Sequence, residues 1–485
     1  MPGRDPRCVP SRAPRGVPGP LVGLLVVGLL LAVPIPPTEA TTTPMAVPNT
    51  PVLSLRRLPG VVASVTADRR LAGALGPMMA GTGGPTGQAC LSVRDPDGRT
   101  LFAQNPATAL IPASTMKLET GTAALGRLGA GSHFTTEVRA GAAPVGGTVT
   151  GDLFLVGGGD PLLATADFAA IAGYRNQPRL ATSMEVLADR VVAAGVRTVE
   201  GRVVGDESRY DTQRYVPSWS PTYASLGEIG PQSALTVNDG FTAWRPVAVP
   251  APAPAANAAA VLTTLLRARG VTIGGDAGEG RAPASPTVAS IDSPSMADVV
   301  GVMLAESDNL AAELLVKELG SRFGGGGTTT AGLSVIKDAL APLGLAADGL
   351  ASVDGSGLDR SDRLSCNSLQ ATLAQGGESG DLGKGLPVAG RSGTLAKRFL
   401  GTPAAGKVKA KTGSLKGVSA LSGWAGTVDG RSLQFALIAN ELPNDASGTG
   451  LEDQVVGALA TWPQAPAAAD ISPLPAAAPA APTKR

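Results

Sequence analysis

Ser114-Thr115-Met116-Lys117 is the first of three short motifs that follow one another in a fixed order along this chain. Ser307-Asp308-Asn309 is the second and Lys411-Thr412-Gly413 is the third. Together they supply a serine that can act as a nucleophile, a lysine that can take its proton, a second polar pair and a cationic strand. Each motif alone is a weak signal, but the three in this order favour lysine-assisted serine chemistry.

The composition limits the other ways in which this chain can activate a serine. His133 is the only histidine among the 485 residues, so a Ser-His-Asp triad or a multi-histidine metal site has almost no material. Lysine is the usual substitute for histidine as the base. We expect no metal and no cofactor. The formal net charge of +1 implies no polyanionic partner, and we therefore expect no nucleic-acid binding.

The N-terminus is typical of an export signal. Four arginines precede an apolar run from Leu21 to Val33, and Thr38-Glu39-Ala40 places small residues where a signal peptidase cleaves. A helix made of that run reaches only roughly 20 Å, which is short for a bilayer. We predict a cleaved signal peptide at residues 1–40 and an extracytoplasmic location. The alternative is an uncleaved anchor, and only in that case do we expect contact with a membrane.

Three cysteines are few for an exported protein. Cys8 lies in the export segment. Cys90 and Cys366 can form a disulfide in an oxidising compartment, or they can be two buried free thiols. The sequence leaves both alternatives open, because it does not reveal the distance between the two Cα atoms.

Strand patterns occur at both ends of the region that we expect to fold, residues 57–462. Near its beginning, a helix candidate at 61–75 precedes the segments 89–93 and 100–103, which flank the turn sequence Asp95-Pro96-Asp97-Gly98. Near its end, three further strand candidates follow one another: residues 408–415, 419–427 and 432–440. We therefore predict an α/β (α+β) fold with an antiparallel sheet that is built from distant parts of the chain and flanked by helices.

The first two motifs are separated by 190 residues, from Lys117 to Ser307, which is more than a helical lobe needs. We interpret residues 138–287 as a large, mainly β insertion. It contains strand candidates at 151–156, 199–205 and 233–237, a helix candidate at 183–194 and a Pro/Ala tract at 246–260 that reads as an exposed loop leading into a helix. The catalytic domain is then discontinuous and consists of residues 57–137 and 288–462. A linker at 41–56 precedes it, and a disordered tail at 463–485 follows it.

Ser114 and Lys117 are three residues apart, so they share one face if they open a helix. Pro112 suits a helix start, and the N-terminal amides of the helix favour negative charge near Ser114. Burial and the neighbouring Lys411 both lower the pKa of Lys117, and a neutral amine beside a serine hydroxyl is a workable base. The alternative for this motif alone is an ordinary surface pair on a helix.

The other two motifs also have a structural and a chemical interpretation. Ser307-Asp308-Asn309 lies between two helical patterns, where a polar tripeptide can simply cap a helix. Lys411 lies in a strand with lysines at alternate positions, which can be a solvated edge. In the chemical interpretation, Lys411 supplies positive charge, Thr412 donates to a terminal carboxylate, and Gly413 lets substrate approach the backbone. The amides of Ser114 and Ser414 then form an oxyanion hole.

With these motifs the sequence resembles the penicillin-recognising serine enzymes, and within them the D-alanyl-D-alanine carboxypeptidase/endopeptidases of peptidase family S13. Further segments resemble that branch: Gly151-Asp152-Leu153, Gly205-Asp206-Glu207-Ser208 and Asp354-Gly355-Ser356-Gly357-Leu358-Asp359-Arg360. The resemblance implies a β-lactamase/transpeptidase-like domain. It also implies a penicillin-binding protein that cleaves the terminal D-Ala-D-Ala bond of peptidoglycan stem peptides, or cross-links, through an acyl-serine, with β-lactams as covalent inhibitors.

The resemblance implies roles for individual residues. Ser114 is the nucleophile and Lys117 its base, Ser307 relays a proton to the leaving group, and Asn309 holds the amide of the substrate. Thr412, Gly413 and Ser414 bind substrate together with the loop that contains Ser356 and Arg360. Arg360 and an acid of the insertion, Asp206, would read the side chain of a diamino acid. The alternative for Arg360 is a surface salt bridge with Asp359 or Asp362.

Two other functions share these motifs. A β-lactamase or esterase needs a glutamate that drives deacylation, and Glu306 and Glu313 do not match the Glu-x-x-Leu-Asn pattern of the class A enzymes. A catalytically retired wall-binding protein is free to lose its motif serines and lysines, and here all of them are intact.

Overall fold

The computed structural model describes residues 50–51, 53–81, 88–171, 179–344 and 351–474. The predicted signal peptide with Cys8 lies outside them, as do residues 41–49 of the predicted linker and 475–485 of the predicted tail. Within the described ranges, no helix is both long and apolar enough to cross a membrane.

The described chain contains helices and strands throughout. The helices are α1 (Pro59–Ala80), α2 (Lys117–Leu128), α3 (Ala166–Ile171), α4 (Met184–Ala193), α5 (Pro254–Arg267), α6 (Met296–Glu306), α7 (Asn309–Phe323), α8 (Thr329–Leu340), α9 (Cys366–Gly376), α10 (Asp381–Lys384), α11 (Asp445–Ala460) and α12 (Ala468–Ile471). The strands are β1 (Ala89–Arg94), β2 (Thr100–Gln104), β3 (Thr135–Ala140), β4 (Thr148–Val149), β5 (Leu153–Val156), β6 (Leu163–Ala164), β7 (Thr182–Ser183), β8 (Thr198–Val199), β9 (Val203–Asp206), β10 (Phe241–Ala243), β11 (Val249–Pro250), β12 (Thr272–Ile273), β13 (Gly278–Glu279), β14 (Thr287–Asp292), β15 (Val408–Leu415), β16 (Val418–Gly426) and β17 (Ser432–Ala439).

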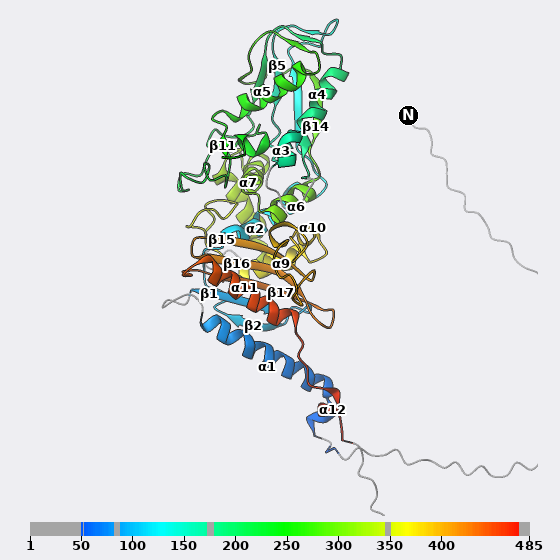
Figure 1. The fold of residues 1–485 in the computed structure, drawn as a ribbon, viewed down its shortest axis with the longest axis vertical. Helices are drawn as coiled ribbons and strands as arrows, with labels where there is room; N and C mark the ends of the chain where they lie inside the picture. The colour runs from blue at the N-terminus through cyan, green and yellow to red at the C-terminus, as the bar shows by residue number, and fades with distance from the viewer. Residues whose placement is uncertain (1–49, 52, 82–87, 172–178, 345–350, 475–485) are drawn as a thin grey trace, which may run out of the picture. The chain divides into compact units, whose positions relative to one another are not determined.

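One five-stranded antiparallel sheet joins the two ends of the described chain. Its order is β15-β16-β17-β1-β2 (Figure 1). Ala89 of β1 lies opposite Ala439 of β17. The predicted hairpin forms because Asp95 caps its turn: one side-chain oxygen accepts from the amides of Asp97 and Arg99 at 3.1 and 2.9 Å. The predicted fold, an antiparallel sheet flanked by helices, is therefore confirmed.

Alternate residues of the central strands supply two separate cores, as the period of a strand requires. In β17, Phe435 and Leu437 face one core with α1 and α11, whereas Ala436 and Ile438 face the other with α2, α6 and α9. The sheet is thus covered by helices on both faces (Figure 1).

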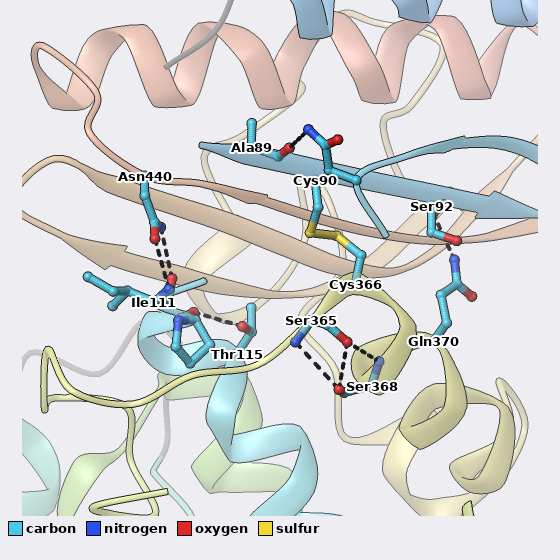
Figure 2. Close-up of a disulfide and its surroundings, with 12 residues drawn as sticks. Ala89, Cys90, Ser92, Ile111, Thr115, Ser365, Cys366, Ser368, Gln370 and Asn440 are labelled. Atoms are coloured by element: carbon cyan, nitrogen blue, oxygen red, sulfur yellow. Dashed lines mark hydrogen bonds between the residues drawn. A yellow bond between two sulfur atoms is a disulfide. The ribbon is translucent and has the colours of Figure 1, made fainter. Parts of the chain in front are cut away.

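A disulfide crosses the second of these cores. Cys90 of β1 is bonded to Cys366, the first residue of α9, and their Cα atoms lie 6.0 Å apart. Figure 2 shows the bond running from the sheet to the helix, next to a hydrogen bond from Gln370 Nε2 to the Ser92 carbonyl at 2.7 Å. Of the two alternatives that the sequence leaves open, the structure has the disulfide.

A second five-stranded sheet, in the order β13-β9-β5-β3-β14, is formed entirely by the chain between the first two motifs. The chain enters through β3 and leaves through β14, which pair with each other in antiparallel fashion. Helices α4 and α5 share a hydrophobic core with this sheet and with a smaller sheet of β12, β8 and β4. We propose that the residues between β3 and β14 are an insertion into the domain that carries the first sheet.

Two local predictions inside this segment need correction. Residues 233–237 are not a strand: the Ser233 hydroxyl contacts Glu207 and the amide of Leu235, so the chain turns although Leu235 and Val237 are buried. The Pro/Ala tract at 246–260 is only partly a loop, because it contains strand β11 and the first turns of α5, which begins at Pro254.

Candidate active site

The first motif begins in a tight turn rather than directly in a helix. A short 3-10 helix, η3 (Ala113–Met116), precedes α2, and Ala113 has a φ of 46°. The neighbouring loop approaches this turn closely: a Cβ on Gly357, whose φ is +81°, would lie 1.9 Å from the Ala113 carbonyl oxygen. Glycine is therefore required at 357, and the turn presents the half-buried Ser114 to solvent.

Lys117 is completely buried at the start of α2 and its amine contacts three oxygens. Nζ lies 3.0 Å from Ser114 Oγ, 2.6 Å from Asn309 Oδ1 and 2.6 Å from the Ser356 carbonyl oxygen. The last two oxygens can only accept hydrogen bonds, whereas the hydroxyl can also donate. A neutral amine has two N–H donors and one lone pair, so this set of partners fits an amine that accepts the proton of Ser114.

The electrostatic surroundings favour that neutral state. Burial lowers the pKa of Lys117 to about 8, although nearby acids, chiefly Asp354 and Glu313, act in the opposite direction. The prediction that burial lowers the pKa of this lysine is in line with this shift.

The second motif connects two helices, as the sequence pattern predicts. Ser307 ends α6 with a left-handed φ of 62°, and Asp308 caps α7 by accepting from the amide of Ala311 at 2.9 Å. Asn309 is the first residue of α7. Its amide nitrogen donates to the Glu228 carbonyl at 2.7 Å, while its oxygen faces Lys117. Both ends of the Asn309 amide are thus held by the protein itself.

The third motif lies in β15, next to the turn that carries Ser114. Lys411 is fully buried, and its amine donates to Ser307 Oγ at 2.9 Å and to the Thr412 carbonyl at 2.7 Å. A Cβ on Gly413 would lie 2.7 Å from the Pro112 carbonyl oxygen. Gly413 is therefore needed so that the strand can lie against the turn, in addition to the predicted approach of substrate.

A loop held by two buried acids completes the environment of Lys117. Glu313 Oε1 accepts from the amides of Gly355 and Ser356 at 3.0 and 2.8 Å. Burial, with a further contribution from Asp354, raises the pKa of Glu313 to about 8. The hydrogen bonds from the loop amides to Glu313 and Asp354 fix the Ser356 carbonyl that contacts Lys117. The side chain of Ser356 is buried, and its hydroxyl has no hydrogen-bond partner among the described residues.

Asp354 organises the rest of the same loop. Its two oxygens accept from the amides of Ser356, Gly357 and Asp359, and from the indole nitrogen of Trp219 at 2.7 Å. Sequence reasoning gave no role to Asp354 or Glu313. The spacing held one usable signal for Glu313. It follows Asn309 by four residues, which places the two side chains on the same face of α7, the face that carries Asn309 toward the site.

The three motifs open into one cleft of about 1470 Å³. Residues from all of them line it: Ser114, Ser307, Asn309, Thr412 and Ser414, together with Arg360. The guanidinium of Arg360 donates to the Lys416 carbonyl at 2.9 Å.

The structure does not bring Asp206 to this cleft. Its side chain is buried at the end of β9, where it accepts from the amides of Ser208 and Ala282 at 2.8 and 2.7 Å. Asp206 thus ties the end of β9 to the chain that follows β13, and it is not among the residues that line the cleft with Arg360. Among the described residues, no group of three or more His, Cys, Asp or Glu side chains is placed to hold a metal ion.

Comparisons with known proteins agree with this geometry. The chain matches the family model "D-Ala-D-Ala carboxypeptidase 3 (S13)" over residues 86–247 and 241–462. It is 33% identical over 426 residues to a D-alanyl-D-alanine carboxypeptidase of Actinomadura sp. (strain R39), covering 71% of this chain and 76% of that protein. It is 32% identical over 430 residues to carboxypeptidase DacB of Mycolicibacterium smegmatis, covering 84% and 86%. In fold, it is similar to penicillin binding protein 4 of Haemophilus influenzae, with a TM-score of 0.67, 19% identity, and coverage of 81% of this chain and 99% of that one.

Proposed function

The chain belongs to the D-Ala-D-Ala carboxypeptidase 3 (S13) family, and from this premise we propose that its cleft cleaves D-Ala-D-Ala termini through an acyl intermediate on Ser114. The protein is a serine-type D-Ala-D-Ala carboxypeptidase and a penicillin-binding protein. The observation that carries the proposed mechanism is the position of the Lys117 amine, 3.0 Å from Ser114 Oγ and otherwise surrounded by acceptors.

In the acylation step, neutral Lys117 takes the hydroxyl proton of Ser114 while Oγ attacks the carbonyl carbon of the scissile peptide bond. The backbone amides of Ser114 and Ser414 stabilise the oxyanion. The carbon–nitrogen bond then breaks. Ser307, which lies 2.9 Å from the Lys411 amine, gives its hydroxyl proton to the departing amine of D-alanine and regains a proton from Lys117, which is then neutral again.

In the second step, water replaces the departed amine. It gives one proton to the neutral Lys117 as its oxygen attacks the acyl carbon. The bond to Ser114 Oγ then breaks, Lys117 returns the proton to Oγ, and the shortened peptide leaves with a new carboxyl group. The hydroxyl of Thr412 lines the cleft, and the amine of the buried Lys411 donates to its carbonyl, so this strand suits the terminal carboxylate of the substrate. A penicillin places its carboxylate and its reactive carbonyl in the same way but lacks a leaving group that diffuses away.

The test is to label the protein with a fluorescent penicillin and to map the labelled peptide. We expect the label on Ser114, no label in Ser114→Ala, and a labelling rate about 10²–10⁴ times lower in Lys117→Ala. His133→Asn is the matched control, because it removes the only histidine and should leave labelling unchanged. Label on another residue, or its retention in Ser114→Ala, would refute the proposal.

We also propose that the natural substrates are stem peptides of peptidoglycan and that the protein acts on the cell-wall side of the membrane. The predicted signal peptide supports this location. N-terminal sequencing of the exported protein tests it: a sequence that begins near Thr41 is expected, and one that retains residues 1–20 argues for an anchor instead.

Arg360 is the proposed reader of the substrate side chain. It lines the cleft, and among the described residues it forms no ion pair with Asp359 or Asp362, which disfavours the surface salt bridge. Arg360→Ala should lower kcat/KM for a peptide with a diamino-acid side chain and leave an acetylated analogue nearly unchanged. Arg360→Lys should recover little, because a lysine cannot bind a carboxylate with two parallel bonds. Equal losses on both peptides would mean that Arg360 only supports the fold.

A further inference from the structure

Asp308 has no step in the proposed reaction, although it is the central residue of the second motif. It is buried beside an ion pair of the segment between β3 and β14. Arg179 donates to both oxygens of Asp239, at 3.0 and 2.6 Å, and its Nη2 lies 3.8 Å from Asp308 Oδ2. One cation from this segment therefore faces two carboxylates, one of which belongs to the motif.

Both side chains of this ion pair are buried, and aromatic rings pack beside it. The side chain of Arg179 is 1% exposed, and its guanidinium lies 5.3 Å from the ring centre of Phe168. Trp244 packs edge-on against the same ring, with 5.9 Å between the ring centres. Asp239 has a left-handed φ of 54°, a conformation that aspartate adopts more readily than most residues other than glycine. Removing two charges from water is costly, and the fork-like geometry with its aromatic support offsets that cost.

The position of Asp308 determines the positions of its two neighbours in the chain, Ser307 and Asn309. As the cap of α7 it fixes where Asn309 begins that helix, and Asn309 contacts the Lys117 amine at 2.6 Å. On its other side is Ser307, whose left-handed backbone brings its hydroxyl within 2.9 Å of Lys411. A displacement of Asp308 consequently moves two groups that contact the two motif lysines.

We propose that the Arg179–Asp239 pair is a positioning device through which the segment between β3 and β14 holds Asp308, and with it Ser307 and Asn309, in the geometry required for acylation. The inference rests on the proposed function, since it concerns the acylation of Ser114. Arg179 and Asp239 do not touch the substrate; they act through Asp308.

The physical reason is the balance of charge in this buried cluster. Without Arg179, the carboxylates of Asp239 and Asp308 are two like charges with the cation between them removed. Asp308 then has to take up a proton or move away, and either response weakens the charged cap on the Ala311 amide. Burial and the proximity of Asp239 already raise the pKa of Asp308 to about 6, which agrees with a carboxylate that depends on its cation.

The experiment measures penicillin acylation by stopped flow in the full chain and separates the binding constant of the first complex from the rate constant of the chemical step. Arg179→Met should lower that rate constant by about 10- to 100-fold and change the binding constant little, because displaced groups impair chemistry more than binding. Arg179→Met/Asp239→Asn removes the like-charge repulsion and should recover the wild-type rate constant to within about threefold.

Two further variants complete the design. Arg214→Met is the matched control: it breaks a two-pronged pair with Glu207 in the same segment, a pair that does not include a motif residue, and it should leave the rate constant unchanged. Arg179→Lys keeps a cation without the fork and should give an intermediate rate constant. If thermal denaturation shows that Arg179→Met does not fold, the rate constant of Arg179→Lys is compared with that of the wild type instead.

A wild-type rate constant in the folded Arg179 variants overturns the inference. A loss that the double variant does not recover, or an equal loss in Arg214→Met, also overturns it, because Arg179 would then only stabilise the fold. Failure of the wild-type protein to acylate on Ser114 refutes the proposed function itself, and this outcome is seen before any Arg179 variant is compared.

Discussion

The lowered pKa of Lys117 predicts a specific dependence of acylation on pH. The amine acts as a base only when it is neutral, and its pKa is about 8. The neutral fraction is then about 1% at pH 6, about 10% at pH 7 and about half at pH 8. The acylation rate constant should therefore rise about tenfold between pH 6 and pH 7, rise less between pH 7 and pH 8, and level off above that.

The assay is the rate of labelling by a fluorescent penicillin between pH 5.5 and pH 8.5, with stability checked at each pH. Lys117→Arg is the informative variant, because a guanidinium stays protonated throughout this range. It should lose about 10²–10⁴ in rate and also lose the pH dependence. A wild-type rate that stays constant from pH 6 to pH 8 would refute Lys117 as the titrating base.

Three further predictions concern the surroundings of the site. Burial raises the pKa of Glu119 from 4.5 to about 8, so the folded state keeps a proton that the unfolded chain loses. The free energy of unfolding therefore falls as the pH rises between these two values. Glu119→Gln should raise the Tm more at pH 7.5 than at pH 5 in thermal denaturation. Replacing Cys90 and Cys366 by alanine should lower the free energy of unfolding, measured in urea, by about 2–5 kcal/mol, and the wild type with reductant should match it. Gly413→Ala places a Cβ 2.7 Å from a backbone carbonyl of the turn that carries Ser114 and should slow labelling, whereas Gly450→Ala, which meets nothing within 4 Å, should not.

The first sheet could be predicted well from local patterns. The strand predicted at 408–415 has the bounds of β15, the one predicted at 419–427 is shifted by one residue from β16, and the one predicted at 432–440 ends one residue beyond β17. Runs of mostly apolar or small residues between turn sequences mark β16 and β17, because these strands are packed on both faces. In the segment between β3 and β14 the pattern was less reliable. The stretch 233–237 has the composition of a strand, but Ser233 forms side-chain hydrogen bonds that turn the chain.

The site shows the same division between local and distant information. The motifs themselves identify Ser114, Lys117 and Lys411, which the structure brings to one place. The contact of Arg179 with Asp308 could not be foreseen, because it joins residues far apart in sequence through packing in three dimensions. Asp206 illustrates the opposite error. Similarity in a short acidic segment suggested a substrate contact, whereas the carboxylate instead binds two backbone amides.

The pairing of β1 with β17 also determines the order in which the protein can be assembled on the ribosome. Ala89 pairs with Ala439, which is translated about 350 residues later. The edge of β1 that faces β17 therefore has no partner for on the order of tens of seconds during translation. The second sheet has no such delay, since its last strand, β14, ends at Asp292. Nascent chains that stop before β17 carry both the serine and the lysine of the first motif but lack the strand that joins the β1–β2 pair to β15 and β16. An unpaired strand edge of this kind attracts other chains, so incomplete synthesis of this protein favours aggregation rather than partial activity.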